Sequence, residues 1–183
     1  MHTAVRQLVD SVERARNALI ASVSDLDDAQ GAFKPSALEW SVTEVLEHLY
    51  LAEISGITKI WAALNDARAG RSWAEIRPNQ GKSIEAIIDA TWKPKETAPP
   101  VATPHIGGPV AAWVSALRSL AGPLRDLSVQ LRDDELERVV FPHFLSGPLD
   151  ARQRLEFLRF HIERHALQVQ RIRTSPGFPT RAT

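Results

Sequence analysis

The sequence predicts an all-α protein: a four-helix bundle with a long irregular insertion between the second and third helices. Four stretches repeat apolar residues at spacings of three and four, the period of an amphipathic helix. No strand pattern of comparable strength is present. The chain has 183 residues, 44% of them apolar, which is enough for one domain with a substantial core. We therefore expect a single bundle domain over residues 1–183.

The first two helices are expected from about Thr3 to Ser24 and from Ser41 to about Asn65. The first carries one apolar stripe, formed by Val5, Leu8, Val9, Val12, Leu19 and Val23. The second opens with a capping box, in which the Ser41 hydroxyl accepts from the Glu44 backbone N–H and the Glu44 carboxylate reaches back. Trp40 precedes this box at a position suited to a hydrophobic staple.

The segment Asp66–Gly108 is expected to be the irregular insertion. It contains Trp73, Trp92 and five prolines, and one short helix near Lys82–Thr91. A stretch of this length inside a compact domain is usually a functional loop or lid. We therefore predict that it covers part of a site at one end of the bundle.

The third helix opens at Pro109, a residue favoured in the first helical turn. Pro123 lies within its apolar run and should break or kink the helix near Ser119. The fourth helix is expected from Asp150 to about Arg173, with Leu155, Leu158, Ile162, Val169 and Ile172 as its stripe. Before it, the residues "RVVF" at Arg138–Phe141 could be short and extended.

Composition excludes several classes of function. Lys+Arg and Asp+Glu are both 22, so there is no net charge to attract nucleic acid or an anionic membrane. There is no cysteine, which excludes disulfides and a cysteine nucleophile. The charged N-terminal stretch is not typical of a signal peptide, and no apolar run approaches the ~20 residues of a membrane span. We expect a cytoplasmic protein that acts on a small molecule.

Two histidines, His161 and His165, stand four residues apart on the fourth helix and therefore share one face. His48 is expected to face the interior from the second helix. Three separate core histidines remain one interpretation, but each would cost roughly 1–3 kcal/mol if left unsatisfied. A shared divalent metal would satisfy all three and keep a coordination position open, as catalytic metal sites do.

Three rival motifs are excluded by the residues present. A zinc-protease helix needs glutamate directly after the first histidine, where this chain has Ile162. Di-iron bundles need glutamate three residues before each histidine ligand, where this chain has Leu158 and Ile162. The glycines at 107–108 lack the lysine of a phosphate-binding loop.

The segments "WSVTEVLEHLYLAE" at 40–53 and "LRFHIERHALQVQRI" at 158–172 resemble the DinB-like family of bacterial metal-binding four-helix bundles. The loop "FPHFLSGPLD" before the last helix fits as well. The resemblance implies a nickel or zinc ion held by His48, His161 and His165. Some relatives resemble transferases that use small thiols such as bacillithiol or mycothiol, and others are called hydrolases.

Three functions therefore stay open. A metal-bound thiol loses its proton near neutral pH, which would allow S-transfer with a low-molecular-weight thiol as cofactor. The same ion could activate water for hydrolysis, or the metal could have no catalytic role. We expect a small-molecule substrate, and a homodimer is compatible with spare apolar surface on a bundle.

Four polar residues could support such a site. Glu44 could orient His48, although the capping box is its simpler role. His143 could carry protons at the open position, with a surface histidine as the alternative. His105 could belong to the lid or be exposed, and Gln168 could bond to His165 or pack between helices.

The remaining residues of note are aromatic or charged. Trp61 and Trp113 are expected in the core. Trp73 and Trp92 could line a substrate cavity or simply anchor the insertion. Glu163–Arg164 is expected to belong to a solvated face.

Overall fold

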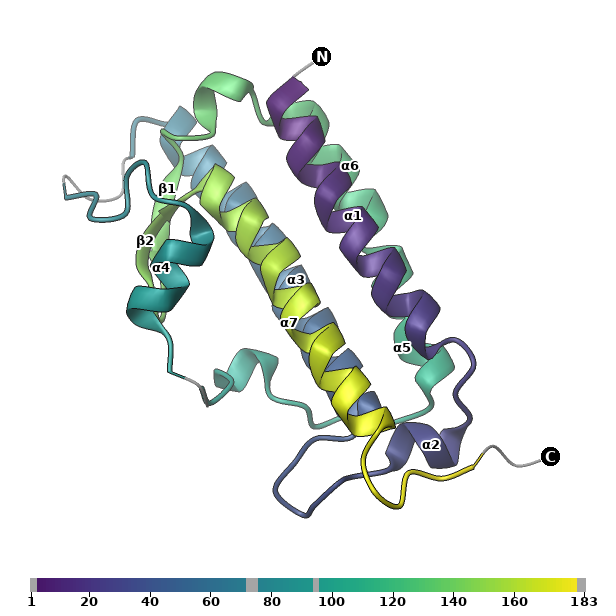
Figure 1. The fold of residues 1–183 in the computed structure, drawn as a ribbon. Coiled ribbons are helices and arrows are strands. Elements are labelled where there is room, and N and C mark those ends of the chain that lie inside the picture. Colours follow the sequence, from purple (N-terminus) through teal and green to yellow (C-terminus); the bar gives the residue numbers. More distant parts are fainter. Residues whose placement is uncertain (1–2, 72–75, 94–95, 181–183) are drawn as a thin grey trace.

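The computed structural model describes residues 3–71, 76–93 and 96–180 and confirms the all-α bundle. Its long helical segments are α1 (Thr3–Val23), α3 (Val42–Arg68), α5 (Val110–Ser119) with α6 (Ala121–Gln130), and α7 (Ala151–Arg173). Helices α3 and α7 lie side by side, with α1, α5 and α6 on one side of the pair (Figure 1). The smaller elements α4, β1 and β2 lie on the other side. No helix among the described residues is long and apolar enough to cross a bilayer.

Local chemistry sets the helix boundaries. Ser41 caps α3 through a capping box with Glu44, as predicted. Asp150 caps α7 in the same way, with Gln153 as its partner. The break expected from Pro123 is present, because α5 ends at Ser119 and α6 begins at Ala121. The helices that carry the histidines therefore start at defined residues, which sets the register of both.

Two small features differ from the expectation. Helix α2 (Asp28–Ala32) is a single capped turn in the stretch expected to be a loop. Strand β1 (Val140–His143) begins two residues after the start of "RVVF" and pairs antiparallel with β2 (Gly147–Asp150). Strands of four residues are too short to show an alternating pattern, so only the extended character of the first could be anticipated.

The insertion contains α4 (Ile84–Thr91) and the 3-10 turn η1 (Pro100–Ala102). The apolar face of α4 is formed by Ile84, Ile87 and Ile88, which pack with Leu149 of β2 in a small cluster apart from the main core. Trp73, proposed to line a cavity, lies outside the described residues. A second 3-10 turn, η2 (Asp133–Glu135), precedes β1.

The main core lies between α1, α3, α5, α6 and α7. Trp113 is buried within it, and Trp61 is partly buried against it, as expected. One ion pair crosses this core: the Arg16 guanidinium of α1 bonds to the Glu53 carboxylate of α3, with Nε 3.1 Å and 3.3 Å from its two oxygens. Both side chains are 2% exposed. A buried charge is tolerated here because its counter-charge is bound directly.

Candidate metal centre and its cavity

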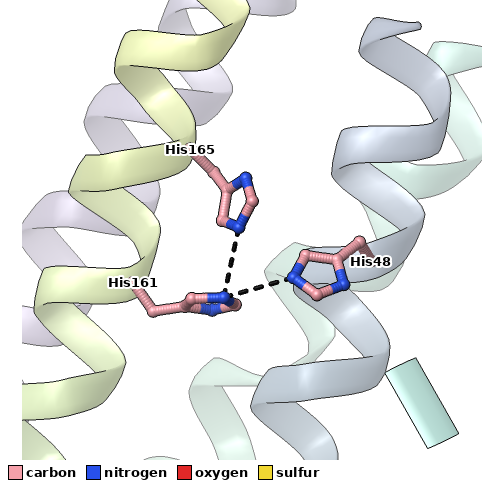
Figure 2. Close-up of side chains that lie close together, drawn as sticks. All are labelled: His48, His161 and His165. Atoms are coloured by element: carbon pink, nitrogen blue, oxygen red, sulfur yellow. Dashed lines mark hydrogen bonds between the residues drawn. The ribbon is translucent and has the colours of Figure 1, made fainter. Parts of the chain in front are cut away.

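The three predicted histidines meet at the interface of α3 and α7. His161 Nε2 lies 3.2 Å from His48 Nε2 and 3.1 Å from His165 Nε2 (Figure 2). All three rings are buried, and one nitrogen from each lies within 4.8 Å of the others. The spacing of four residues places His161 and His165 one turn apart on α7, and the packing of α3 against α7 adds His48. The cluster could hold one metal ion.

Hydrogen bonds to the outer ring nitrogens orient two of the rings. His48 Nδ1 lies 2.7 Å from the Ala102 carbonyl oxygen, which can only accept, so this nitrogen carries the proton. His165 Nδ1 lies 2.7 Å from Gln168 Oε1, and because an amide oxygen accepts, His165 Nδ1 is also the donor. In the neutral rings, the Nε2 lone pairs of His48 and His165 therefore point toward His161. The proposed Gln168 contact is confirmed.

The arrangement fits a divalent cation better than a hydrogen-bonded cluster. A proton on His161 Nε2 can be donated to only one neighbour, so at least one inward lone pair lacks a donor. Two nitrogens bound to one zinc ion at about 2.0–2.1 Å are separated by roughly 3.0–3.4 Å, depending on coordination geometry. The observed separations of 3.1 Å and 3.2 Å fall in this range. A cation would satisfy all three lone pairs together.

Burial also keeps the three rings neutral, the state that binds metal. It lowers the pKa of His48, and it lowers the pKa of His165 to about 3. The pKa of His161 falls well below its usual range, first because of burial and then because the other two rings would repel its charge. At neutral pH all three are therefore potential ligands.

A buried carboxylate ties the insertion to this site. Glu47, which precedes His48, accepts from the backbone N–H groups of His105, Ile106 and Gly107 at 2.5 Å, 2.7 Å and 2.9 Å. Burial by itself raises the pKa of Glu47, and the three N–H groups lower it to a net value below the usual range. The segment that carries Ala102 is thereby fastened to α3 next to the histidine that it orients.

The histidine cluster opens on a cavity of about 660 Å³. Its floor is the α3–α7 pair, and its walls come from the insertion and from the loop between β1 and β2. Trp92, Pro99, Val101 and Ala102 of the insertion line it, which places this segment over the histidine-bearing face. The volume is typical of a site for an organic molecule.

His143 is buried rather than on the surface, which corrects the simpler of its two interpretations. It is 8% exposed, lines the cavity and stacks against Trp92 with ring centroids 6.2 Å apart. Burial, then the positive charges of Arg154 and Lys59, lower its pKa to about 3. His143 is the last residue of β1 and pairs with Gly147 of β2, so its burial depends on a strand pairing that the sequence did not predict.

Arg164 also differs from expectation. It is partly buried and lines the cavity, and its guanidinium lies 5.6 Å from the centre of the Trp92 ring. Its neighbour Glu163 is exposed as expected and pairs with Arg159. The insertion covers one side of α7, and the sequence of α7 could not show which of its charged residues would be covered.

The remaining candidates take their simpler roles. The Glu44 carboxylate bonds to Ser41 N and to Lys34 Nζ, while Ala102 rather than Glu44 accepts from His48. The His105 side chain is 66% exposed. Glu44 thus acts as a cap, and His105 contributes its backbone N–H to the Glu47 cluster.

Three site residues were missed. The Trp40 ring, expected as a staple, stacks on the His165 ring at 6.4 Å and packs at a tilt against the His48 ring, with centroids 4.9 Å apart. Arg154 lies seven residues before His161, and this spacing could have placed it on the same face of α7. Ala102 acts through its backbone carbonyl, which no sequence signal reveals.

Comparisons with known proteins agree with this architecture. The family model of the DinB superfamily matches residues 11–169. A protein of Bacillus subtilis strain 168, described as uncharacterized protein YuaE, is 28% identical over 154 residues, which cover 81% of this chain and 86% of that protein. The crystal structure of a conserved protein from Enterococcus faecalis superposes with a TM-score of 0.58 at 17% identity, over 94% of this chain and 96% of that one.

Proposed function

Because the chain belongs to the DinB superfamily and its three inward histidines meet beside a cavity, we propose that it is a metal-dependent enzyme that activates a small thiol for S-transfer. The proposed ligands are His48, His161 and His165, and the proposed ion is zinc or nickel. The observation that carries this proposal is the convergence of three neutral imidazoles at one end of a cavity of about 660 Å³.

The residues of the chain would prepare this site before any substrate arrives. Ala102 and Gln168 hold the His48 and His165 rings with their Nε2 lone pairs inward. When bound, a divalent ion would supply the Lewis acidity that favours the deprotonated form of a thiol or of water. Trp92, Phe157 and Leu158 contribute apolar lining, which would limit the contact of the reacting groups with water.

Cavity size is compatible with transfer as well as with hydrolysis. Hydrolysis needs one organic substrate and a water molecule, whereas S-transfer needs a thiol and an electrophile side by side. A volume of about 660 Å³ has room for two small organic molecules. We assign His143 hydrogen-bond donation rather than proton transfer, because a ring with a pKa of about 3 does not accept a proton at neutral pH.

Metal content tests the ligand assignment. Wild type and the alanine variants of His48, His161, His165 and His105 would be purified identically without a His tag and measured by elemental analysis. The first three should lose most of the metal, because two remaining imidazoles bind an ion too weakly. His105→Ala is the matched control, since its side chain is exposed, and it should keep wild-type metal. Equal metal in His48→Ala and wild type would refute a site shared between α3 and α7.

A second assay tests the reaction itself. Metal-loaded wild type and His161→Ala would be given an electrophile with a panel of small thiols, and ester and amide substrates in parallel. Thioether formation that requires both metal and His161 supports the proposal. Ester or amide cleavage without thioether formation would replace it with hydrolysis. No reaction by a protein that still binds metal would leave a non-catalytic role.

A further inference from the structure

The cavity has a second polar end, away from the histidines. Arg154 lies seven residues before His161 on α7, which places it on the same helix face and roughly 10 Å away along the axis. Lys59 lies eleven residues after His48 on α3, again on the same face, at roughly 16 Å. Between His48 and Lys59, α3 contributes only Ala52, Ser55 and Gly56 to the cavity floor. These small residues leave the space between the two ends open.

The Arg154 guanidinium is buried without a carboxylate. Arg154 is 7% exposed, and its Nη2 donates to the backbone carbonyls of Phe141 and Pro142. Its Nε has no hydrogen-bond partner, and no described residue accepts from Nη1. Among residues 3–71, 76–93 and 96–180 no acidic side chain forms an ion pair with Arg154. A buried cation with unused donors is costly unless something else supplies the negative charge.

A neutral donor stands beside this cation. His143 Nδ1 accepts from the backbone N–H groups of Leu145 and Ser146 at 3.4 Å and 3.2 Å. In the neutral ring the proton is therefore on Nε2, which has no acceptor among the described residues. Arg154 and Lys59 are close enough to His143 for their positive charges to lower its pKa further than burial alone does. Three donors from α3, α7 and β1 thus gather in one region of the cavity.

The cavity as a whole favours anions. Its charged lining residues are Lys59, Arg154, Arg164 and Arg171 against Glu39 and Glu96. This excess of positive charge exists before any metal is counted. The walls near Arg154 are apolar, with Phe157, Leu158 and Trp92, so the anionic group that fits here is attached to an organic body.

We propose that Arg154, His143 and Lys59 form a carboxylate subsite, which holds the acid group of an organic substrate while the rest of that molecule extends toward the histidine cluster. This deepens, and for its functional meaning rests on, the proposed metal-dependent activity. The carboxylate would accept from Arg154 Nη1 and from His143 Nε2, and the Lys59 ammonium would lie at its outer side. Such charged hydrogen bonds discriminate strongly between an acid and the matched alcohol.

Calorimetric binding to chelator-treated, full-length protein tests the subsite without metal or thiol. The probes are octanoate, 1-octanol and inorganic phosphate. Wild type should bind octanoate at least about tenfold more tightly than octanol, the effect of one charged hydrogen bond. Arg154→Met should reduce this preference to less than about twofold, and Arg154→Lys should restore part of it. Lys59→Met, at an exposed position that should not disturb folding, should weaken octanoate binding by about threefold or more.

The matched control is Arg159→Met, which removes the same charge from the same helix outside this cavity. It should leave the preference unchanged. Equal binding of octanoate and octanol by wild type, or an equal loss in Arg159→Met and Arg154→Met, would overturn the subsite. Phosphate binding that depends on Arg154 while octanoate binding does not would overturn its assignment to carboxylates.

The two proposals fail separately. Absence of metal from purified protein, together with an Arg154-dependent preference for octanoate, would remove the function and keep the subsite. Metal held by the histidines without any preference for octanoate would remove the subsite and keep the function. Zinc reloading followed by titration with 8-mercaptooctanoate then tests whether both ends act on one molecule, since its affinity should exceed that of octanoate only in the reloaded protein.

Discussion

Arg16 and Arg154 are both buried arginines, and they belong to two different environments. Arg16 lies in the α1–α3 interface, where the Glu53 carboxylate takes its charge directly. Arg154 lies at the cavity wall, where two backbone carbonyls accept from it and the Phe141 ring lies 3.9 Å from its guanidinium carbon. Burial lowers the pKa of Arg154 to about 9, so it still carries its charge at neutral pH. The Arg16 charge is used in a structural ion pair, whereas the Arg154 charge has no carboxylate partner and is available to bind an anionic ligand.

The largest expected effect comes from breaking the compensated pair. Glu53→Ala leaves the Arg16 charge buried alone and should lower the free energy of unfolding by about 3–5 kcal/mol. Urea denaturation followed by circular dichroism measures this. The double variant Arg16→Met with Glu53→Leu should regain most of the loss, because no charge is then buried. If Glu53→Ala and the double variant were equally unstable, packing rather than charge would explain the loss.

The dependence of stability on acid should report the burial of His143 beside Arg154. The pKa of His143 is about 3 when folded and close to 6.5 when unfolded. Between these values only the unfolded chain binds the proton, so the contribution of His143 to stability is complete above pH 6.5 and is lost as the pH falls toward 3. One such group changes the free energy of unfolding by up to about 1.4 kcal/mol per pH unit.

His143→Gln should therefore make metal-free protein less sensitive to acid by about 1 kcal/mol per unit between pH 6 and pH 4. Urea titrations at several pH values measure the slope of the free energy of unfolding against pH. His48, His161 and His165 are present in both proteins and contribute equally to both slopes. An unchanged slope in His143→Gln would mean that its ring is accessible to protons in the folded state.

Arg154→Met should have a much smaller effect on stability than Glu53→Ala. It removes an uncompensated buried charge, which should stabilise the protein. It also leaves the Phe141 and Pro142 carbonyls without this donor, which should destabilise it. We expect the free energy of unfolding to change by less than about 1 kcal/mol in either direction. A loss of 3 kcal/mol or more, measured by urea denaturation, would make Arg154 a structural residue like Arg16.

The smallest effect is expected at an ion pair near the surface, between α1 and α6. Glu13 of α1 pairs with Arg125 of α6 at 3.1 Å, and the Arg125 side chain is 69% exposed. Glu13→Gln should lower the free energy of unfolding by no more than about 0.5 kcal/mol, and this cost should shrink at high salt. Thermal melts at low and high ionic strength measure this. A salt-independent cost would show that Glu13 contributes by packing.

The sequence determined the parts of this molecule that depend on local periodicity and capping. The stripes predicted four helical segments, Ser41 and Asp150 predicted two helix starts, and Pro123 predicted the break between α5 and α6. A spacing of four residues was enough to place His161 and His165 on one face, because an α-helix repeats every 3.6 residues. The inward face of α3 was sufficient to add His48 to them.

The tertiary structure decided what distant segments do to one another. Only the folded chain brings the Ala102 carbonyl to His48, since a backbone acceptor has no side chain to mark it. Only the folded chain distinguishes the environments of Arg16 and Arg154. They differ in whether a carboxylate from another helix bonds to the guanidinium. For the same reason, the sequence left His143 open between a site residue and a surface histidine. Burial, and the change in pKa that follows from it, depends on what packs over a residue.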